Sequence, residues 1–440
     1  MKNNRLFLFV SILLISWGLS AQETYNLQKV LEIGLNNNYD IRIARNEEKI
    51  SSNNKTIGNA GFLPSVDLSA SYNGTNNKTK YEYADGTTDR TDYLLNQNAN
   101  IGLNLSWTIF DGFKIQTNYE RLKEFQKMGE ITTRLTIERL MADLTAEYYN
   151  YIRQTLRYAN LKQALDLSKE RLRIVEARYS IGSMSRLELQ QTRVYFNADS
   201  SNLIKQFEVV NTSAIILNQL MALPDVSQEI LIPDSIIEPN LLLDKDFLWM
   251  KTLEANTSLL LAEENKTLSE LDLKTYQSQN YPYLRLNGGY GYHTNLYENS
   301  TYKKQNVLGF NYGVTLGFDV FNGFNRRREQ KNAKIQIQNK VLEKERLELS
   351  LKADLSNMWM AYQNNIQLIK LEKENLTVAK ENYEIAMERY MLGDLSGIDL
   401  REAQNSLLEA QESLLESQFN TKLCEISLLQ ISGSITSYLE

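Results

Sequence analysis

The side chains that most often perform chemistry in proteins are nearly missing from this sequence. Its 440 residues include one cysteine, Cys424, and one histidine, His293. An internal disulfide and a site built from several His and Cys ligands are therefore both excluded. A catalytic triad would need His293 as its base, and no triad-type motif surrounds that residue. We therefore predict no catalytic residue and no cofactor, and we place His293 in a polar surface loop of a hairpin.

Two methionines near the C-terminal part of the chain are candidates for binding a soft metal ion. Met387 and Met391 are four residues apart, which is the spacing of one helix face. Thioethers are ligands for soft metals such as copper(I). Methionines at helical spacing are more often ordinary packing residues, so we predict no metal site.

Charge and hydropathy exclude two large classes of protein. Lys plus Arg number 48 and Asp plus Glu number 54, so the net charge is −6, and no dense basic run occurs. A nucleic-acid partner is therefore not expected. The mean hydropathy of −0.42 excludes a polytopic helical membrane protein. Scarce Gly (20) and Pro (5) with abundant Tyr (25) favour long helices with some aromatic β-structure.

The N-terminus has the pattern of a signal peptide. Lys2 and Arg5 precede an apolar run over residues 6–19, and the small residues Ser20 and Ala21 follow. A membrane-spanning helix needs about 20 apolar residues, which is more than this run provides. We therefore predict a signal peptide over residues 1–21, cleaved after Ala21 or Ser20, and export from the cytoplasm.

The sequence contains an internal repeat. Residues 101–113 resemble residues 312–324, and residues 178–182 resemble residues 389–393, both at an offset of 211 (312 minus 101 and 389 minus 178). We predict a first repeat over residues 22–221 and a second over 244–431. A linker with three prolines over 222–243 joins them, and a tail covers 432–440.

Each repeat contains apolar residues at a strict interval of seven, which predicts long helices packed as coiled coils. The positions are Leu144, Tyr151, Tyr158, Leu165, Leu172 and Tyr179, and then Leu355, Tyr362, Ile369, Leu376, Tyr383 and Tyr390. About 66 residues at roughly 1.5 Å each give a rod of about 100 Å. Glycines near 182 and 393 end these rods, and Ser185 and Ser396 begin new helices with capping-box patterns. Each repeat therefore forms a helical hairpin with its tip near 182 or 393.

Four segments alternate between apolar and polar residues, which predicts strands over about 65–73, 101–110, 283–292 and 310–320. Membrane strands have this length and alternation, with aromatic residues at the lipid boundary. A soluble two-sided sheet shows the same alternation. In a membrane no sheet edge stays open, so a barrel built from these four strands must be shared between chains. Two chains give eight strands with an interior filled by side chains, and three give 12 strands with room for a lumen. The aromatic residues at one end are Phe110, Phe113, Phe321 and Phe324.

The sequence resembles the TolC-like outer membrane channel family. The likeness rests on the duplicated half and on prolines at 64 and 282 before strands. It also rests on the Phe-Asp-Gly-Phe and Phe-Asn-Gly-Phe turns at 110–113 and 321–324, and on Tyr-x-x-Gly at both tips. It covers nearly the whole mature chain. It implies an α+β, mostly α fold and a homotrimer, with a 12-stranded barrel in outer membrane lipid and a periplasmic α-helical barrel. It also implies partnership with a periplasmic adaptor and an inner-membrane transporter in efflux or type I secretion.

The resemblance also assigns roles to residues at the hairpin tips. Tyr390 matches a gating tyrosine, Asp399 and Glu402 match acidic positions of the pore constriction, and Glu188 matches an acidic tip position. Leu395 stands where the best-known member has a gating arginine, so that member's bond network is not expected here. The positions that meet the adaptor are Ile181, Gly182, Leu392 and Gly393.

The residues by themselves leave alternatives open. Three copies of Asp399 and Glu402 would form a ring of carboxylates that favours cations. Glu188 and Asp399 also sit where a capping box needs an acid, and Tyr390 lies on the apolar heptad stripe. A soluble periplasmic coiled-coil adaptor or scaffold is the main alternative function. A simple diffusion porin would not need the long helices, and the exported substrate is not predicted.

Overall fold

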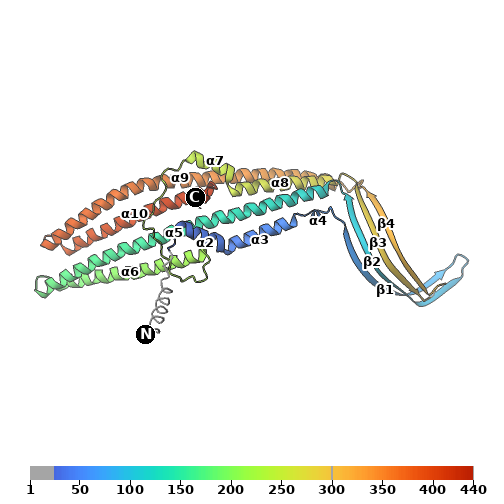
Figure 1. Cartoon of the computed structure of the whole chain (residues 1–440), viewed down its shortest axis with the longest axis horizontal. Helices are drawn as coiled ribbons and strands as arrows, with labels where there is room; N and C mark the ends of the chain where they lie inside the picture. The colour runs from blue at the N-terminus through green and yellow to red at the C-terminus, as the bar shows by residue number, and fades with distance from the viewer. Residues whose placement is uncertain (1–23, 299–300, 440) are drawn as a thin grey trace, which may run out of the picture. The chain divides into compact units, whose positions relative to one another are not determined.

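The computed structural model describes residues 24–298 and 301–439 (Figure 1). The fold is mostly helical and includes one antiparallel sheet of four strands. The predicted signal peptide lies outside the described residues. None of the helices in the described part of the chain has the length and apolarity that a membrane-crossing helix needs. Two compact units are present. The first holds the described residues up to Asn46, Ile131–Leu260 and the residues from Glu345 onward; the second holds Glu47–Glu130 and Leu261–Lys344.

The first unit consists of helices. It contains α2 (Leu27–Asn37), α6 (Arg186–Leu220), α7 (Lys245–Ala255), α10 (Gly397–Ile431) and the short 3-10 helix η1 (Ile435–Leu439). Four helices have residues in both units, namely α3 (Tyr39–Asn54), α5 (Lys114–Ser180), α8 (Thr257–Ser278) and α9 (Asn325–Leu392). The linker over 222–243 contains no helix, and the tail over 432–440 includes η1.

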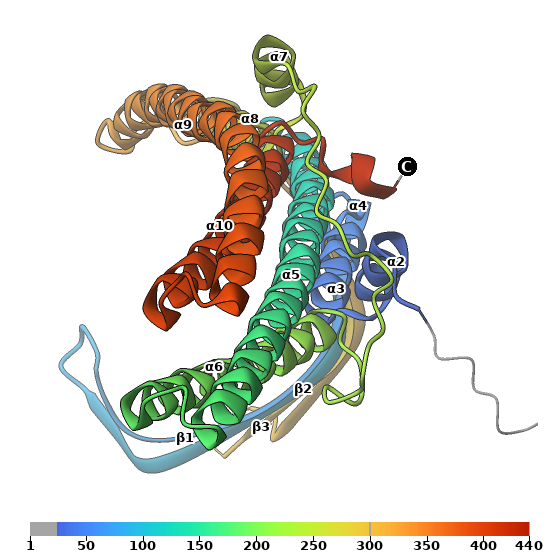
Figure 2. The same cartoon turned by 90° about the vertical axis from the view of Figure 1, so that its left-hand side faces the viewer.

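Two helical hairpins dominate the first unit, α5 with α6 and α9 with α10 (Figure 2). Gly182 and Gly393 have φ of 77° and 87°, the left-handed conformation that glycine adopts without a Cβ penalty. The side chains of Ser185 and Ser396 accept the backbone N–H groups of residues 188 and 399, at 3.1 and 3.2 Å. The predicted serine caps are therefore confirmed.

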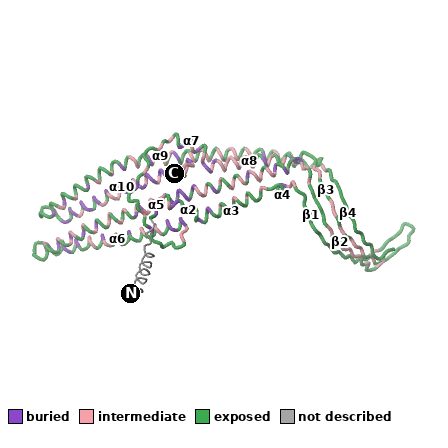
Figure 3. The backbone as a smooth tube through the Cα atoms, viewed as in Figure 1, coloured by how far each residue is buried: buried purple, intermediate pink, exposed green. Residues whose placement is uncertain are grey.

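The core of the first unit lies where the base of the first hairpin meets α2, α10 and the linker. Tyr148, Leu144 and Leu217 are fully buried there, and Figure 3 shows buried residues along the helices and none in the described strands. The hydroxyl of Tyr148 donates to Asp234 of the linker at 2.6 Å. Glu425 of α10 accepts the backbone N–H of residue 240 at 2.7 Å, which fastens the linker to the helices.

The second unit contains the short helix α4 (Ile57–Ala60) and the sheet. Its strands are β1 (Ser65–Glu82), β2 (Thr88–Phe110), β3 (Tyr283–Tyr297) and β4 (Lys304–Gly317), in the order β1-β2-β3-β4. All neighbours are antiparallel; Leu103, for example, lies opposite both Leu68 and Tyr290. Strand β2 pairs with β3 only from Asn96 onward, so residues 88–95 form a two-stranded ribbon with β1.

The strand boundaries differ from those predicted. The strands predicted over 65–73, 101–110 and 283–292 are longer, and the one predicted over 310–320 begins at 304 and ends at 317. Polar residues continue the ladders, because backbone hydrogen bonds need no apolar alternation. His293, which we placed in a loop, lies inside β3 opposite Asn100 and contacts its side chain. The prediction of a loop was wrong because a polar residue such as His293 can also be part of a strand ladder.

Candidate functional site

Each hairpin ends in an exposed apolar side chain beside a left-handed glycine. Ile181 and Leu392 are each 78% exposed. No atom lies within 4 Å of the position that a Cβ would take at Gly182 or Gly393. The four residues that the resemblance assigns to adaptor contact are therefore accessible within one chain.

Tyr390 is packed between four helices. It is 1% exposed and contacts a cluster formed by Val175, Leu189, Leu400 and neighbouring residues of α5, α6, α9 and α10. Its hydroxyl has no hydrogen-bond partner among the described residues. Burial raises the pKa of Tyr390, and the nearby Arg171 opposes that rise. The packing role that the heptad predicts for Tyr390 is therefore present in the single chain.

A buried arginine, Arg171 of α5, lies where the two hairpins meet. Arg171 is 4% exposed, and its Nε and Nη1 atoms have no hydrogen-bond partner in the described part of the chain. A Cβ at Gly397 would lie 2.1 Å from Oε1 of Glu188 and 2.9 Å from Nη2 of Arg171. The carboxylate of Glu188 and the guanidinium of Arg171 therefore both lie over the first turn of α10. The positive end of that helix favours a carboxylate at this place.

A second arginine joins the first hairpin to the end of α9. Arg178 donates to the backbone carbonyl oxygens of Tyr390 and Met391, at 3.3 and 2.9 Å. These carbonyls belong to the last turn of α9, where no further helical N–H is available. Arg178 therefore caps the helix of the other hairpin.

A buried ion pair lies farther from the tips. Arg401 of α10 donates to both carboxylate oxygens of Asp199 of α6, at 2.6 and 2.7 Å. Ser168 of α5 also donates to Asp199. The ring of Tyr195 lies beside two guanidiniums, 5.2 Å from Arg401 and 5.4 Å from Arg171. We call Ser168, Asp199 and Arg401 the hairpin clasp, because they tie α5 and α6 to α10.

The two acidic residues predicted at the constriction are exposed. Asp399 accepts the hydroxyl of Ser396 at 2.8 Å, which is a capping arrangement. Glu402 is exposed on α10. Among the residues with described positions, no hydrogen bond joins Glu188 to Asp399 or to Glu402.

The methionines near the second tip have different environments. Met387 packs against the cluster around Tyr390, whereas Met391 is exposed. The described residues include no group of three or more His, Cys, Asp or Glu side chains that could hold a metal ion.

The predicted interface aromatics form two matching pairs at the turns from strand to helix. Phe110 with Phe113 and Phe321 with Phe324 each have ring centroids 5.2 Å apart in an edge-to-face arrangement. Phe113 and Phe324 have φ of 72° and 61°, a conformation that costs a bulky residue about 1–2 kcal/mol. Both rings are exposed, by 54% and 69%. Phe113 and Phe324 therefore combine a strained backbone conformation with an exposed ring.

The sheet has one exposed apolar face and one polar face. The exposed apolar side chains include Val66, Leu68, Tyr312 and Leu316, which are 62–82% exposed. The polar face carries amides and hydroxyls that bond across strands; Asn104, for example, donates to Asp67 at 3.2 Å and to Ser69 at 2.9 Å. In the described sheet, β1 and β4 each have a neighbour on one side only.

An exposed apolar sheet, open edges and long helical hairpins define the class of an outer membrane channel. The outer membrane efflux protein family matches residues 30–223 and 248–434. The chain belongs to this outer membrane efflux protein family.

Solved structures with the same fold include three outer membrane proteins. The CmeC outer membrane channel of Campylobacter jejuni has a TM-score of 0.77 at 18% identity, covering 95% of this chain and 90% of that one. VceC from Vibrio cholerae has a TM-score of 0.73 at 17% identity, covering 92% and 96%. The open state of the MtrE channel of Neisseria gonorrhoeae has a TM-score of 0.72 at 16% identity, covering 92% and 88%. A comparison with curated protein sequences finds no match.

Proposed function

We propose that this protein is the outer membrane component of a tripartite export system. Three copies form a 12-stranded barrel and a periplasmic helical tunnel, and the assembly is a passive conduit from periplasm to exterior. A periplasmic adaptor and an inner-membrane transporter complete the system, and adaptor docking at the tips opens it. The exposed apolar face of the sheet is the observation that carries this proposal.

The sheet supports the membrane location and the shared barrel. Side chains such as Leu68 (68% exposed) and Tyr312 (82% exposed) would be costly to leave in water, and lipid removes that cost. In lipid, the unpaired backbone groups of β1 and β4 each cost several kcal/mol unless another strand satisfies them. Pairing β1 of one copy with β4 of the next closes the sheet. Three copies of four strands give 12, which leaves room for a lumen.

The hairpin tips support a gate at the periplasmic end. Arg178 bonds the end of the first hairpin to the second hairpin within one chain, and Arg171 and Glu188 lie close to Gly397 of the second hairpin. We assign this arrangement to the closed state. Tyr390 contributes by packing, and Asp399 and Glu402 of three chains line the constriction. The adaptor contacts the tip residues Ile181, Gly182, Leu392 and Gly393. It shifts the equilibrium between the closed and open states toward the open state, because it binds the open state more tightly.

The first test is the mass of the mature protein purified from membranes in detergent, by light scattering with the detergent subtracted. Three chains per particle are expected, together with pores in a planar bilayer. Two chains would give eight strands and no open lumen, which contradicts the conduit. A protein found only in the soluble fraction would instead support a periplasmic adaptor or scaffold.

A further inference from the structure

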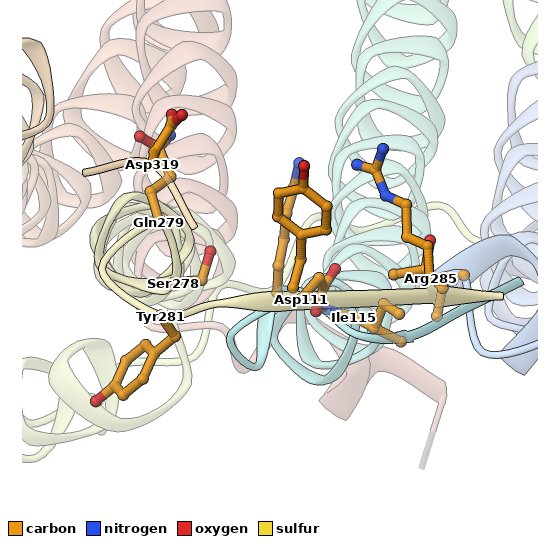
Figure 4. A pocket seen from close by; sticks show the side chains of 12 residues that line it. Asp111, Ile115, Ser278, Gln279, Tyr281, Arg285 and Asp319 are labelled. Atoms are coloured by element: carbon orange, nitrogen blue, oxygen red, sulfur yellow. Dashed lines mark hydrogen bonds between the residues drawn. The ribbon is translucent and has the colours of Figure 1, made fainter. Parts of the chain in front are cut away.

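A cavity of about 480 Å³ opens in the second unit, where α5 and β3 begin (Figure 4). Its lining includes two cations, Lys114 and Arg285, and two acids, Asp111 and Asp319. Figure 4 shows Arg285 and Asp319 on the same side of β3, with the ring of Tyr281 on the other side. None of these side chains belongs to the tip, the hairpin clasp or the aromatic pairs.

Arg285 is held in place by an aromatic ring. Its guanidinium lies 4.6 Å from the ring centroid of Tyr283, a cation–π distance. That ring in turn covers Gly317 of β4, where a Cβ would lie 2.2 Å from Cζ of Tyr283. The planar face of the guanidinium is therefore engaged, while its N–H groups remain for a ligand. Neither Arg285 nor Lys114 forms an ion pair within the described part of the chain.

The two acids of the cavity balance its two cations in formal charge, but among the described residues neither acid forms an ion pair with Arg285 or Lys114. Oδ1 of Asp111 accepts the backbone N–H of Ile115 at 3.1 Å, so this carboxylate is engaged in capping α5. Asp319 remains as the one carboxylate of the lining without a hydrogen bond in the described residues. Thr108 lies directly opposite Arg285 in the sheet register and adds a hydroxyl. The lining thus has no net formal charge, and Arg285 and Lys114 offer hydrogen-bond donors that no carboxylate of the described lining accepts.

The orientation of the strand decides which ligands reach the cavity. The ring of Tyr281 packs edge-to-face on the ring of Phe113, with the centroids 5.8 Å apart. Tyr281 therefore lies on the same side as the aromatic pair Phe110 and Phe113, which we call the aromatic side. Arg285 projects from the opposite face of β3, the face that carries Asn287 and the other polar residues. A ligand on that face arrives from water and not from the bilayer, if the aromatic side faces lipid as proposed.

We propose that this cavity is a binding site for an oxyanion, a phosphate, sulfate or carboxylate group, on a dissolved solute. Arg285 is the main ligand because its guanidinium can donate two parallel hydrogen bonds to such a group, and Lys114 adds a second charge. This inference rests on the proposed function for the source of the ligand. It then gives the conduit a site that favours anionic solutes where the strands meet the helices.

The test is titration calorimetry of the full-length protein in detergent with inorganic pyrophosphate as the probe. Arg285→Gln should weaken binding about tenfold or more, because it removes a charge-assisted bidentate contact. Asp319→Asn should tighten binding, because it removes the competing carboxylate. Arg328→Gln is the matched control, since this arginine is exposed on α9 and pairs with Glu329 at 3.6 Å; it should leave binding unchanged.

Several outcomes overturn the inference. Equal pyrophosphate affinity in the unmodified protein and Arg285→Gln, or no binding at all, excludes the site. Vesicles of glycerophospholipids are the competitor that tests for a lipid ligand. If they abolish pyrophosphate binding, the cavity binds a lipid headgroup and not a dissolved solute. A protein that binds pyrophosphate through Arg285 but forms no pores keeps the site and refutes the conduit. If the protein forms pores but its pyrophosphate binding does not depend on Arg285, the conduit is kept and the site is refuted.

Discussion

We expect that removing one charge from the hairpin clasp lowers the stability of the helices around it by a large amount. Asp199→Asn leaves Arg401 in a buried place without a counterion; the side chains are 8% and 15% exposed. Breaking a buried, hydrogen-bonded pair by removing one partner costs about 3–5 kcal/mol. Asparagine retains one acceptor for the guanidinium, so we expect a value near the lower end, about 3 kcal/mol.

Hydrogen exchange measured by mass spectrometry on the protein in detergent reports this cost peptide by peptide. Local opening governs exchange in α6 and α10, and about 1.4 kcal/mol corresponds to a tenfold change. Exchange of peptides around Asp199 and Arg401 should therefore accelerate about 100-fold, with little change near Tyr148. Asp166→Asn is the matched control, because Asp166 is exposed on α5 close to Ser168; surface changes of this kind stay within about 0.5 kcal/mol.

A second variant separates loss of the pair from loss of packing. Asp199→Leu combined with Arg401→Met removes both charges, and such replacements are often neutral or stabilising. We expect the double variant to recover most of the slow exchange. If Asp199→Asn changes exchange in α6 and α10 by less than about twofold, the ion pair is not closed in solution and the reasoning fails.

Three further predictions follow from single contacts. Tyr390→Phe should leave thermal stability unchanged or raise it, because the buried hydroxyl has no partner among the described residues; a marked fall in melting temperature would contradict this. Gly397→Ala should speed hydrogen exchange at the start of α10, because its Cβ would meet Glu188 at 2.1 Å; Gly393→Ala, which meets no atom, is the control for a steric cause and carries backbone strain alone. Burial and the neighbouring Glu124 raise the pKa of Glu264 to about 7. A carboxyl group with a raised pKa binds more protons in the folded state, so stability falls as pH rises from 4.5 to about 7. Glu264→Gln should remove part of that fall in pH-dependent denaturation, and an identical pH profile would refute the assignment.

The sequence predicts the parts of this fold that depend on local periodicity. The heptads around Tyr151 and Tyr362 indicate the long helices, and Gly182 and Gly393 mark their ends because only the backbone is involved. Arg171 carries no such signal, since an arginine on a long amphipathic helix is usually exposed. Its burial depends on Gly397, more than 200 residues away in the chain.

The sequence does not predict where the strands end, for a related reason. Residues 74–82 and 88–95 are mostly polar and mostly exposed, and they pair because one strand of a hairpin positions the backbone groups of the other. Alternation detects only strands with one buried or lipid-facing side. His293 was misplaced because it lies on the polar face, where the contact with Asn100 replaces apolar burial.

The two hairpins use corresponding residues in different ways, and this asymmetry bears on how a gate would work. Arg178 and Arg389 are 211 positions apart, yet Arg178 caps the end of α9 in the other hairpin while Arg389 donates to residue 394 in its own turn, at 3.4 Å. Glu188 likewise lies over α10, whereas Asp399 stays at its own serine cap. Near the tips, Arg178 of the first hairpin thus donates to the second hairpin, and Asp399 and Glu402 of the second stay exposed. An outward movement of the second hairpin would therefore break the hydrogen bonds that Arg178 donates, without first disturbing the serine cap of Asp399.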